Sequence, residues 1–220
     1  MLNRISPQNR ITLIVILLAA VVVAGIVTYE VSKPSQAPTD AAQSNAVVRA
    51  DSHRLSTAAD DKVTLVEFLD FECEACRAAF PFVESLRETY DGQVTFVARY
   101  FPIDSHVNAR NAAHAVEAAA RQGKFEDMYK RMYETQADWG ESQDSQAALF
   151  RSFAEDLDLD MATFDADVNS PEVAERVQND VDDGLALGVS GTPTFFLNGK
   201  MLQPETTEDF TDAIDAALAE

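Results

Sequence analysis

The sequence predicts an α/β domain with a block of helices inserted into it, preceded by one transmembrane helix. An uncharged segment of membrane-spanning length lies close to the N-terminus. A strand, a helix and a second strand then follow, and a long stretch without strand patterns separates them from a final hairpin and helix. The chain has 220 residues, 46% of them apolar, which suits one domain with a buried core and some appendages.

The composition is strongly acidic, with a formal net charge of −20. Binding to the phosphates of nucleic acid requires clustered cations, so the composition argues against a nucleic-acid partner. Net charge bears on solubility rather than on fold, and a solvated acidic surface accounts for it. The function must therefore be sought in the motifs.

The apolar segment near the N-terminus covers residues 11–28 and contains no charged side chain. About 20 such residues cross a bilayer as a helix, and the preceding Arg4 and Arg10 favour a cytoplasmic N-terminus. We therefore predict a cytoplasmic segment at residues 1–10, a transmembrane signal anchor at 11–30 and an extracytoplasmic C-terminal part. A cleaved secretory signal is the alternative, although its apolar region is usually only about 7–15 residues long.

A linker and a β-α-β unit are predicted after the anchor. Residues 31–57 are rich in Ser, Ala, Pro, Gln and Asp without apolar periodicity, which indicates a flexible linker before a domain at 58–220. Residues 62–71 are almost continuously apolar, as in a strand buried on both faces. Residues 73–90 have helical apolar spacing and 93–101 alternate as a strand. This order predicts parallel pairing with a right-handed crossover.

The rest of the domain is predicted to be a helical insertion followed by a hairpin and a helix. No strand pattern occurs at about 105–188. Asn198 and Gly199 form a strong hairpin signal within 194–202, and residues 206–218 are typical of an amphipathic helix. Helical periodicity within the insertion occurs at 106–122, 124–137, 145–157 and 171–187.

The two cysteines form a C-x-x-C pair, Cys73 and Cys76, where the buried strand becomes a helix. Cys73 is placed beside unpaired N–H groups and the positive end of the helix dipole, which favours the reactive thiolate, while Cys76 can resolve a mixed disulfide. A structural disulfide here would close too small a loop to stabilise much. A zinc site needs two further ligands, and His53, His106 and His114 lack zinc-like spacing. We expect dithiol chemistry without a metal or an organic cofactor.

The chain resembles the thioredoxin superfamily, and more narrowly the DsbA-like disulfide oxidoreductases that carry an inserted helical domain. The resemblance covers about residues 60–220 and rests on the motifs VEFLDFECEAC and SGTPTFFLNGK and on Pro81 in the helix after the cysteines. It implies a thioredoxin fold and a buried catalytic acid at Glu67. It also implies a cis-proline at Pro193, preceded by Thr192, that faces the active site and binds substrate.

Elementary chemistry supports these roles independently. Burial in an apolar strand would raise the pKa of Glu67 and suit it to proton transfer with Cys76; a place at the solvent end of the strand is the alternative. Pro193 cannot donate to a β-ladder, and a cis bond would let Thr192 offer backbone groups to an extended substrate; a trans turn is the alternative. Pro81 either kinks the helix or begins it.

We therefore predict a membrane-tethered, extracytoplasmic thiol-disulfide oxidoreductase that acts on thiols of secreted proteins. The resemblance implies reoxidation by a membrane redox partner. A reductase or isomerase on the same fold and a non-catalytic metal-binding or chaperone domain are the alternatives. DsbA has Pro-His between its cysteines, whereas here Glu74 places a negative charge beside Cys73. We expect an intermediate reduction potential, about −150 to −240 mV.

Overall fold

The computed structural model describes residues 47–220. Within them, the strands are β1 (His53–Ser56), β2 (Val63–Leu69), β3 (Val94–Tyr100), β4 (Thr194–Leu197) and β5 (Lys200–Met201). The helices are α3 (Glu74–Thr89), α4 (Ala109–Ala120), α5 (Phe125–Trp139), α6 (Ala147–Asp156), α7 (Met161–Asp167), α8 (Pro171–Ala186) and α9 (Thr207–Ala219). None of these helices is long and apolar enough to cross a membrane. The anchor predicted at 11–30 lies outside the described residues.

The strands form one mixed sheet in the order β1-β3-β2-β4-β5. Strand β2 runs parallel to β3, from Val63 opposite Val94 to Leu69 opposite Tyr100, and antiparallel to β4. The predicted β-α-β unit is therefore confirmed. The hairpin predicted at Asn198 and Gly199 joins β4 to β5, and both of these residues have the positive φ that such a turn requires.

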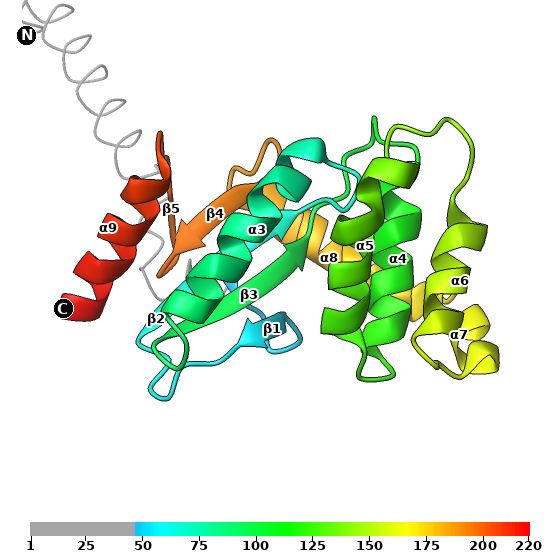
Figure 1. Cartoon of the computed structure of the whole chain (residues 1–220), viewed down its shortest axis with the longest axis horizontal. Helices are drawn as coiled ribbons and strands as arrows, with labels where there is room; N and C mark the ends of the chain where they lie inside the picture. Colours follow the sequence, from blue (N-terminus) through cyan, green and yellow to red (C-terminus); the bar gives the residue numbers. More distant parts are fainter. Residues whose placement is uncertain (1–46) are drawn as a thin grey trace, which may run out of the picture. The chain divides into compact units, whose positions relative to one another are not determined.

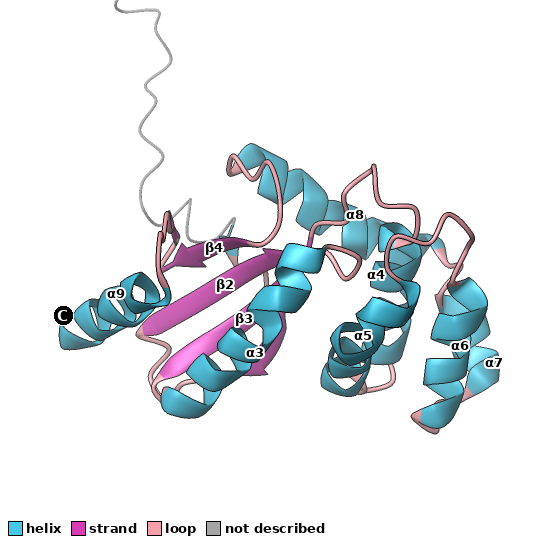
Figure 2. Ribbon diagram, turned by 45° about the horizontal axis from the view of Figure 1, so that its top comes forward, coloured by secondary structure: helices cyan, strands magenta, loops and turns pink. Residues whose placement is uncertain are grey.

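Helices cover both faces of this sheet. Figure 1 and Figure 2 show α3 and α9 on one face and α8 on the other, with α4–α7 beyond one end of the strands. Because side chains alternate along a strand, Leu65 and Leu69 of β2 pack toward α3, whereas Val66 and Phe68 pack toward α8. A Cβ atom at Gly184 of α8 would lie 3.2 Å from the ring of Phe68, so this glycine lets α8 lie close to the sheet.

The inserted block is built around α4, which contacts α5, α6, α7 and α8. Its buried residues are mostly alanines, so neighbouring helices can approach it closely on several sides. The helical insertion predicted at about 105–188 is thus present. The structure adds the short helix α7, which begins where the Asp160 side chain accepts a hydrogen bond from the Thr163 backbone N–H.

The N-terminal boundary of the domain differs from the prediction. The linker was predicted to end at residue 57, but β1 already pairs antiparallel with β3. This strand reads HRLS and buries only Leu55, so its polar composition resembles that of the residues before it. Val47 is also buried, against the α8 face of the sheet. An edge strand of this kind is stabilised by its partner strand rather than by its own pattern.

The first helix of the insertion also begins later than predicted. Its start was expected at His106, but α4 begins at Ala109 and His106 lies in the preceding loop. Two buried carboxylates hold this loop: Asp70 accepts from the Ile103 N–H and Glu72 accepts from the Asn108 N–H. These acids come from the segment before the first cysteine, so the loop belongs to the candidate site.

Candidate active site at the dithiol

The two cysteines lie at the start of α3, as their spacing predicted. Cys73 is the N-cap residue, in extended conformation, and Cys76 lies in the first turn. Both are free thiols and both are buried, with Cys76 fully so. The Cys73 N–H donates to the Asp70 carbonyl at 3.2 Å, which fixes the turn between β2 and α3.

The two sulfur atoms are electrostatically unequal. The pKa of Cys73 falls to about 5, first because the Cys76 thiol hydrogen-bonds to its sulfur, then because the Thr192 side chain does so, and further because N–H groups of the first helical turn do so. The pKa of Cys76 is raised well above its usual value, chiefly by burial and then by this same hydrogen bond. Cys73 is therefore suited to be the nucleophile and leaving group, and Cys76 the protonated, resolving thiol.

The Thr192–Pro193 segment lies beside Cys73. The peptide bond between these two residues is cis, so the trans alternative does not apply. The Cys73 Sγ donates a hydrogen bond to the Thr192 carbonyl at 3.3 Å. Tertiary folding thus joins two segments separated by 119 residues. A carbonyl beside the reactive sulfur is placed to meet an extended substrate chain.

Glu67 lies inside the core on the α3 side of the sheet, between Leu65 and Leu69. Only 5% of it is exposed, so the alternative at the solvent end of the strand does not apply. The pKa of Glu67 is raised to about 8, chiefly by burial and to a lesser extent by the negative charges of Cys73 and Glu84. An acid with such a pKa can exchange a proton with a nearby thiol at neutral pH.

Pro81 lies inside α3, which already begins at Glu74. The alternative in which the helix starts at Pro81 is therefore wrong. Glu74 itself is exposed, and the groups that chiefly lower the pKa of Cys73 are the Cys76 thiol, the Thr192 side chain and backbone N–H groups. The effect of Glu74 on the reduction potential stays a prediction.

The three histidines lie apart from one another, and only His106 lies near the cysteines. His53 contacts Glu117 at 2.6 Å, His106 contacts Asp70 at 2.6 Å, and His114 lines a depression among helices α4, α6 and α7. Within residues 47–220 no three or more His, Cys, Asp or Glu side chains are grouped so that they could hold a metal ion.

Comparison with known proteins identifies the family of this domain. The Thioredoxin_4 family model, described as thioredoxin, matches residues 55–216, which is more than half of the chain. The chain belongs to this thioredoxin family. Its fold is the α/β thioredoxin fold with an inserted helical region, as found in the DsbA-like thiol-disulfide oxidoreductases, and Cys73 and Cys76 form its C-x-x-C pair.

Solved structures with this fold include a thioredoxin-like oxidoreductase from Silicibacter pomeroyi DSS-3. It is 26% identical, with a TM-score of 0.67 over 80% of this chain and 98% of that one. BdbD from Bacillus subtilis is 22% identical, with a TM-score of 0.65 over 76% and 92% of the two chains. Alpha-DsbA1 from Wolbachia pipientis is 19% identical, with a TM-score of 0.67 over 79% of this chain and 94% of that one. The last two similarities concern the fold alone.

The curated relatives are much longer proteins. Na(+)/H(+) antiporter NhaA 3 from Salinispora tropica is 40% identical over 159 residues, which are 71% of this chain and 23% of that protein. NhaA 1 from Mycobacterium sp. strain KMS is 34% identical over 64% of this chain and 22% of its own length. This thioredoxin-family chain thus spans less than a quarter of the length of these relatives.

Several residues of the site were not singled out from the sequence. Gln136 of α5 donates to the carbonyls of Phe71 and Cys73 at 2.7 and 2.9 Å, so the helical insertion holds the loop before α3. Asp70, 1% exposed, accepts from the Glu72 N–H at 2.9 Å. No local pattern marks Gln136, because its partners are 63 and 65 residues away.

His106 could have been found from the strand order. Asp70 follows β2 and His106 comes after β3, and the carboxyl ends of parallel strands meet at one edge of a sheet. Burial alone would lower the pKa of His106, but the hydrogen bond and charge of Asp70 outweigh it, and the pKa is raised; the charge of Cys73 contributes in the same direction. The interpretation of His106 as structural or solvated agrees with its contact with the buried Asp70, and the structure adds that this pair lies beside the dithiol.

Two surface depressions lie near the dithiol and differ in character. One, of about 480 Å³, lies beyond Pro193 and has mixed polar and apolar walls. The other, of about 400 Å³, is acidic and includes His106. The first is lined by Ala79, Pro193, Phe195, Leu202 and Phe210 among others, and the second by Glu72, Glu74, His106, Val107, Glu141 and Gln143 among others.

Proposed function

We propose that this protein catalyses thiol-disulfide exchange in secreted proteins, outside the cytoplasm, through Cys73 and Cys76. The observation that carries the proposal is the inequality of the two thiols. One has a pKa of about 5 and lies beside Thr192 and Pro193, and the other is a fully buried thiol with a raised pKa. Such a pair suits an attack at one sulfur and resolution at the other.

In the oxidising direction a substrate thiolate attacks Sγ of Cys73 in the Cys73–Cys76 disulfide. The S–S bond breaks, a mixed disulfide forms, and Cys76 leaves as a thiolate that takes a proton from Glu67. A second substrate thiolate then attacks the substrate sulfur of the mixed disulfide, and Cys73 leaves as a thiolate. The substrate loses two electrons as its disulfide forms, and the enzyme gains them as a dithiol.

The net direction we propose is oxidation. A thiol with a low pKa leaves readily, and stabilisation of its thiolate stabilises the reduced enzyme, which makes the disulfide form an oxidant. The low pKa of Cys73 therefore favours an oxidase over a reductase on the same fold. A membrane redox partner would remove the two electrons and restore the disulfide. The exchange reaction itself requires only the two sulfur atoms of Cys73 and Cys76 and a proton donor.

The proposed location is the outer side of the cell membrane, with the segment at 11–30 as a single-pass anchor. The apolar segment and the arginines before it support this topology. The similarity of this domain to a part of proteins named as Na(+)/H(+) antiporters agrees with a place beside a membrane. A reporter that works only outside the cytoplasm, fused after Glu220, should be active, and the protein should stay in membranes after a carbonate wash.

Trapping experiments test the assignment of the two thiols. Cys76→Ser should accumulate mixed disulfides between Cys73 and client proteins, since the resolving thiol is absent. Cys73→Ser should accumulate few, and it should abolish oxidation of a reduced test protein in glutathione buffer. The reverse trapping pattern, or full activity of Cys73→Ser, would show that the proposed exchange reaction is wrong.

A further inference from the structure

A buried carboxylate, Asp70, lies close to the sulfur on which the proposed exchange reaction depends. Asp70 is 1% exposed. Its Oδ1 accepts the Glu72 N–H at 2.9 Å, and Glu72 adjoins Cys73, so the carboxylate lies within about 7 Å of the Cys73 backbone nitrogen. A negative charge at this distance disfavours a thiolate, whereas the proposed function requires the thiolate of Cys73.

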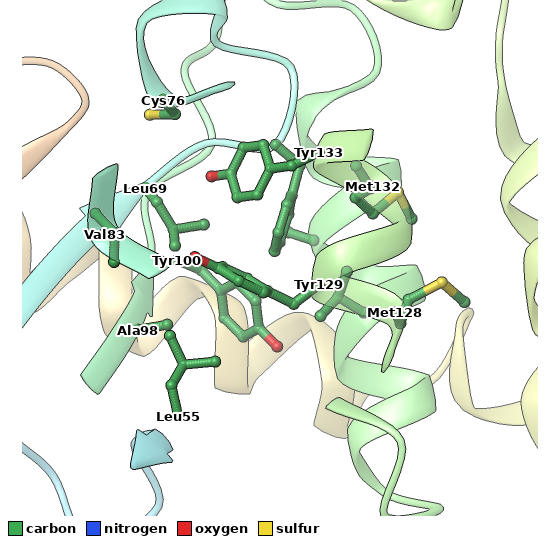
Figure 3. Close-up of a cluster of buried hydrophobic side chains, with 14 of the residues drawn as sticks. Leu55, Leu69, Cys76, Val83, Ala98, Tyr100, Met128, Tyr129, Met132 and Tyr133 are labelled. Atoms are coloured by element: carbon green, nitrogen blue, oxygen red, sulfur yellow. The ribbon is translucent and has the colours of Figure 1, made fainter. Parts of the chain in front are cut away.

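The fold retains this carboxylate because it joins the turn before α3 to the loop before α4. In addition to its bond within the turn, it accepts the Ile103 N–H at 3.0 Å. The Asp70 carbonyl accepts the Cys73 N–H at 3.2 Å and the Tyr133 hydroxyl at 3.5 Å. Figure 3 shows Tyr133 reaching from α5 into the core, toward the region that holds Cys76. Asp70 thus fixes the backbone that carries Cys73.

His106 supplies a compensating positive charge. Its Nδ1 lies 2.6 Å from Oδ2 of Asp70, and 30% of its side chain is exposed, so it can take up a proton from water. Within residues 47–220 it is the one cationic group that forms an ion pair with Asp70. Burial would lower the pKa of His106, but the hydrogen bond and charge of Asp70 outweigh burial, and the pKa is raised. The imidazole is therefore protonated near pH 5, where Cys73 titrates.

The depression of about 400 Å³ that His106 lines contains no other cation among residues 47–220. Arg110 of α4, the nearest cation along the chain, contacts Asp104 at 3.2 Å and Gln178 instead. The titratable groups that face His106 are Asp70, Glu72 and Cys73 from the turn before α3, Glu74 from α3 and Glu141 from the loop after α5. All of these are acids, so loss of the imidazolium would leave the Asp70 charge unbalanced.

We propose that His106 is a positioning residue for the exchange reaction: its charge neutralises the buried Asp70 carboxylate and so keeps Cys73 in the reactive thiolate form. A cation between the two cysteines could favour the thiolate directly, but this chain has Glu74 and Ala75 there. With His106 in place, Asp70 can hold the turn and the loop without opposing the chemistry at Cys73. His106 acts through Asp70 and is not itself a catalytic residue. This role rests on the proposed function.

The first test compares His106→Gln with His114→Gln in the full-length protein. Both changes replace an imidazole by a neutral amide, but His114 lines the depression among α4, α6 and α7, away from the dithiol. His106→Gln should raise the pKa of Cys73, measured from the pH dependence of iodoacetamide alkylation, by about 1 unit. It should also make the protein about 10-fold less oxidising in equilibrium with glutathione at pH 7. His114→Gln should change neither quantity. If the two variants behave alike, the role of His106 is refuted while the exchange reaction stands.

A double variant separates the effect of charge from that of structure. When Asp70→Asn is combined with His106→Gln, both charges are removed together. The pKa of Cys73 should then return to within about 0.3 unit of its value in the unmodified protein. A purely structural role of the pair predicts a shift at least as large as that of His106→Gln alone, and this result would overturn the proposal.

The unmodified protein provides a test that does not depend on the folding of any variant. Because the coupling is reciprocal, formation of the Cys73 thiolate on reduction of the disulfide should raise the pKa of His106 by about 1 unit. NMR titration of the histidines in the two redox forms measures this shift. Equal pKa values of His106 in both forms would contradict the proposal. If the unmodified protein shows no disulfide exchange with glutathione, the proposed function is wrong, whatever the histidine titrations show.

Discussion

The two faces of the sheet bury ionisable groups in opposite ways. On the α8 face, Arg99 of β3 is fully buried, with Nε 2.6 Å from Asp180 and one terminal nitrogen 2.6 Å from Asp183. Asp180 also contacts Arg176 at 2.7 Å, and Arg99 donates to the Val47 carbonyl at 2.7 Å. Every charge named here has an opposite charge beside it, and the network holds the N-terminal segment on the domain.

On the α3 face, the buried titratable groups include Cys76, Glu67, Tyr129 and Tyr133, and within residues 47–220 none of these four forms an ion pair with a cation. Their pKa values are raised, chiefly by burial. Paired charges keep their protonation state across physiological pH and serve the architecture. Groups buried without such partners change protonation readily and serve proton-coupled chemistry. The same sheet thus separates a structural ionic core from a reactive one.

The largest effect on stability is expected on the α8 face, where the buried charges are paired. Asp180→Asn would leave Arg99 and Arg176 buried without their shared carboxylate, and should lower the free energy of unfolding by about 3–5 kcal/mol. Denaturant titration measures the loss, and the exchange rate per folded molecule should be unchanged. Asp182→Asn, at an exposed site that bonds only Gln178, is the control. A loss below about 1 kcal/mol for Asp180→Asn would show that the network contributes little.

On the α3 face, removal of a buried ionisable group is expected to increase the stability of the protein rather than lower it. Folding raises the pKa of Glu67 from 4.5 to about 8, so between these values the folded state keeps a proton that the unfolded state has lost. Stability therefore falls as pH rises through this window, and the penalty vanishes below about pH 4.5. Glu67→Gln should stabilise the protein by roughly 1–3 kcal/mol at pH 7, not at pH 4, and slow exchange. Destabilisation at pH 7 would contradict this account.

A smaller effect concerns the hydrogen bond between the two thiols. Cys76→Ala removes the largest contribution to the low pKa of Cys73, so this pKa should rise from about 5 toward 9.0, by at least ~1 unit. The pH dependence of iodoacetamide alkylation reports it. Cys76→Ser keeps a donor at this position and should raise the pKa less. Equal pKa values in the two variants would place the main effect in the helix N–H groups.

The smallest effect is expected at Glu74. Its side chain is exposed, and water and salt screen its charge from the sulfur. Glu74→Gln should change the pKa of Cys73 by less than about half a unit, which corresponds to ~15 mV in reduction potential. Equilibration with a glutathione series measures the potential directly. A change of tens of millivolts would restore the importance that the sequence argument gave to this charge.

Local patterns predicted most of the thioredoxin core. The apolar run before the cysteines and the alternation after α3 are strong signals because the strands they form are buried, and Asn198-Gly199 marks a turn by its own backbone preference. Strand β1 and helix α7 were missed because a four-residue polar edge strand and a seven-residue helix carry too little pattern of their own. Both are formed by contact with neighbours.

The features of the active site also divide into those predicted by local sequence and those set by tertiary contacts. The sequence by itself determined the dithiol at a helix start, because that follows from residues adjacent along the chain. It favoured burial of Glu67 but left the solvent end of the strand open, and the structure decided between them. Only the tertiary structure placed Thr192 against Cys73 and Gln136 under the loop before α3. Hydrogen bonds and charges act over a few ångströms, and only the folded chain decides which distant residues come that close.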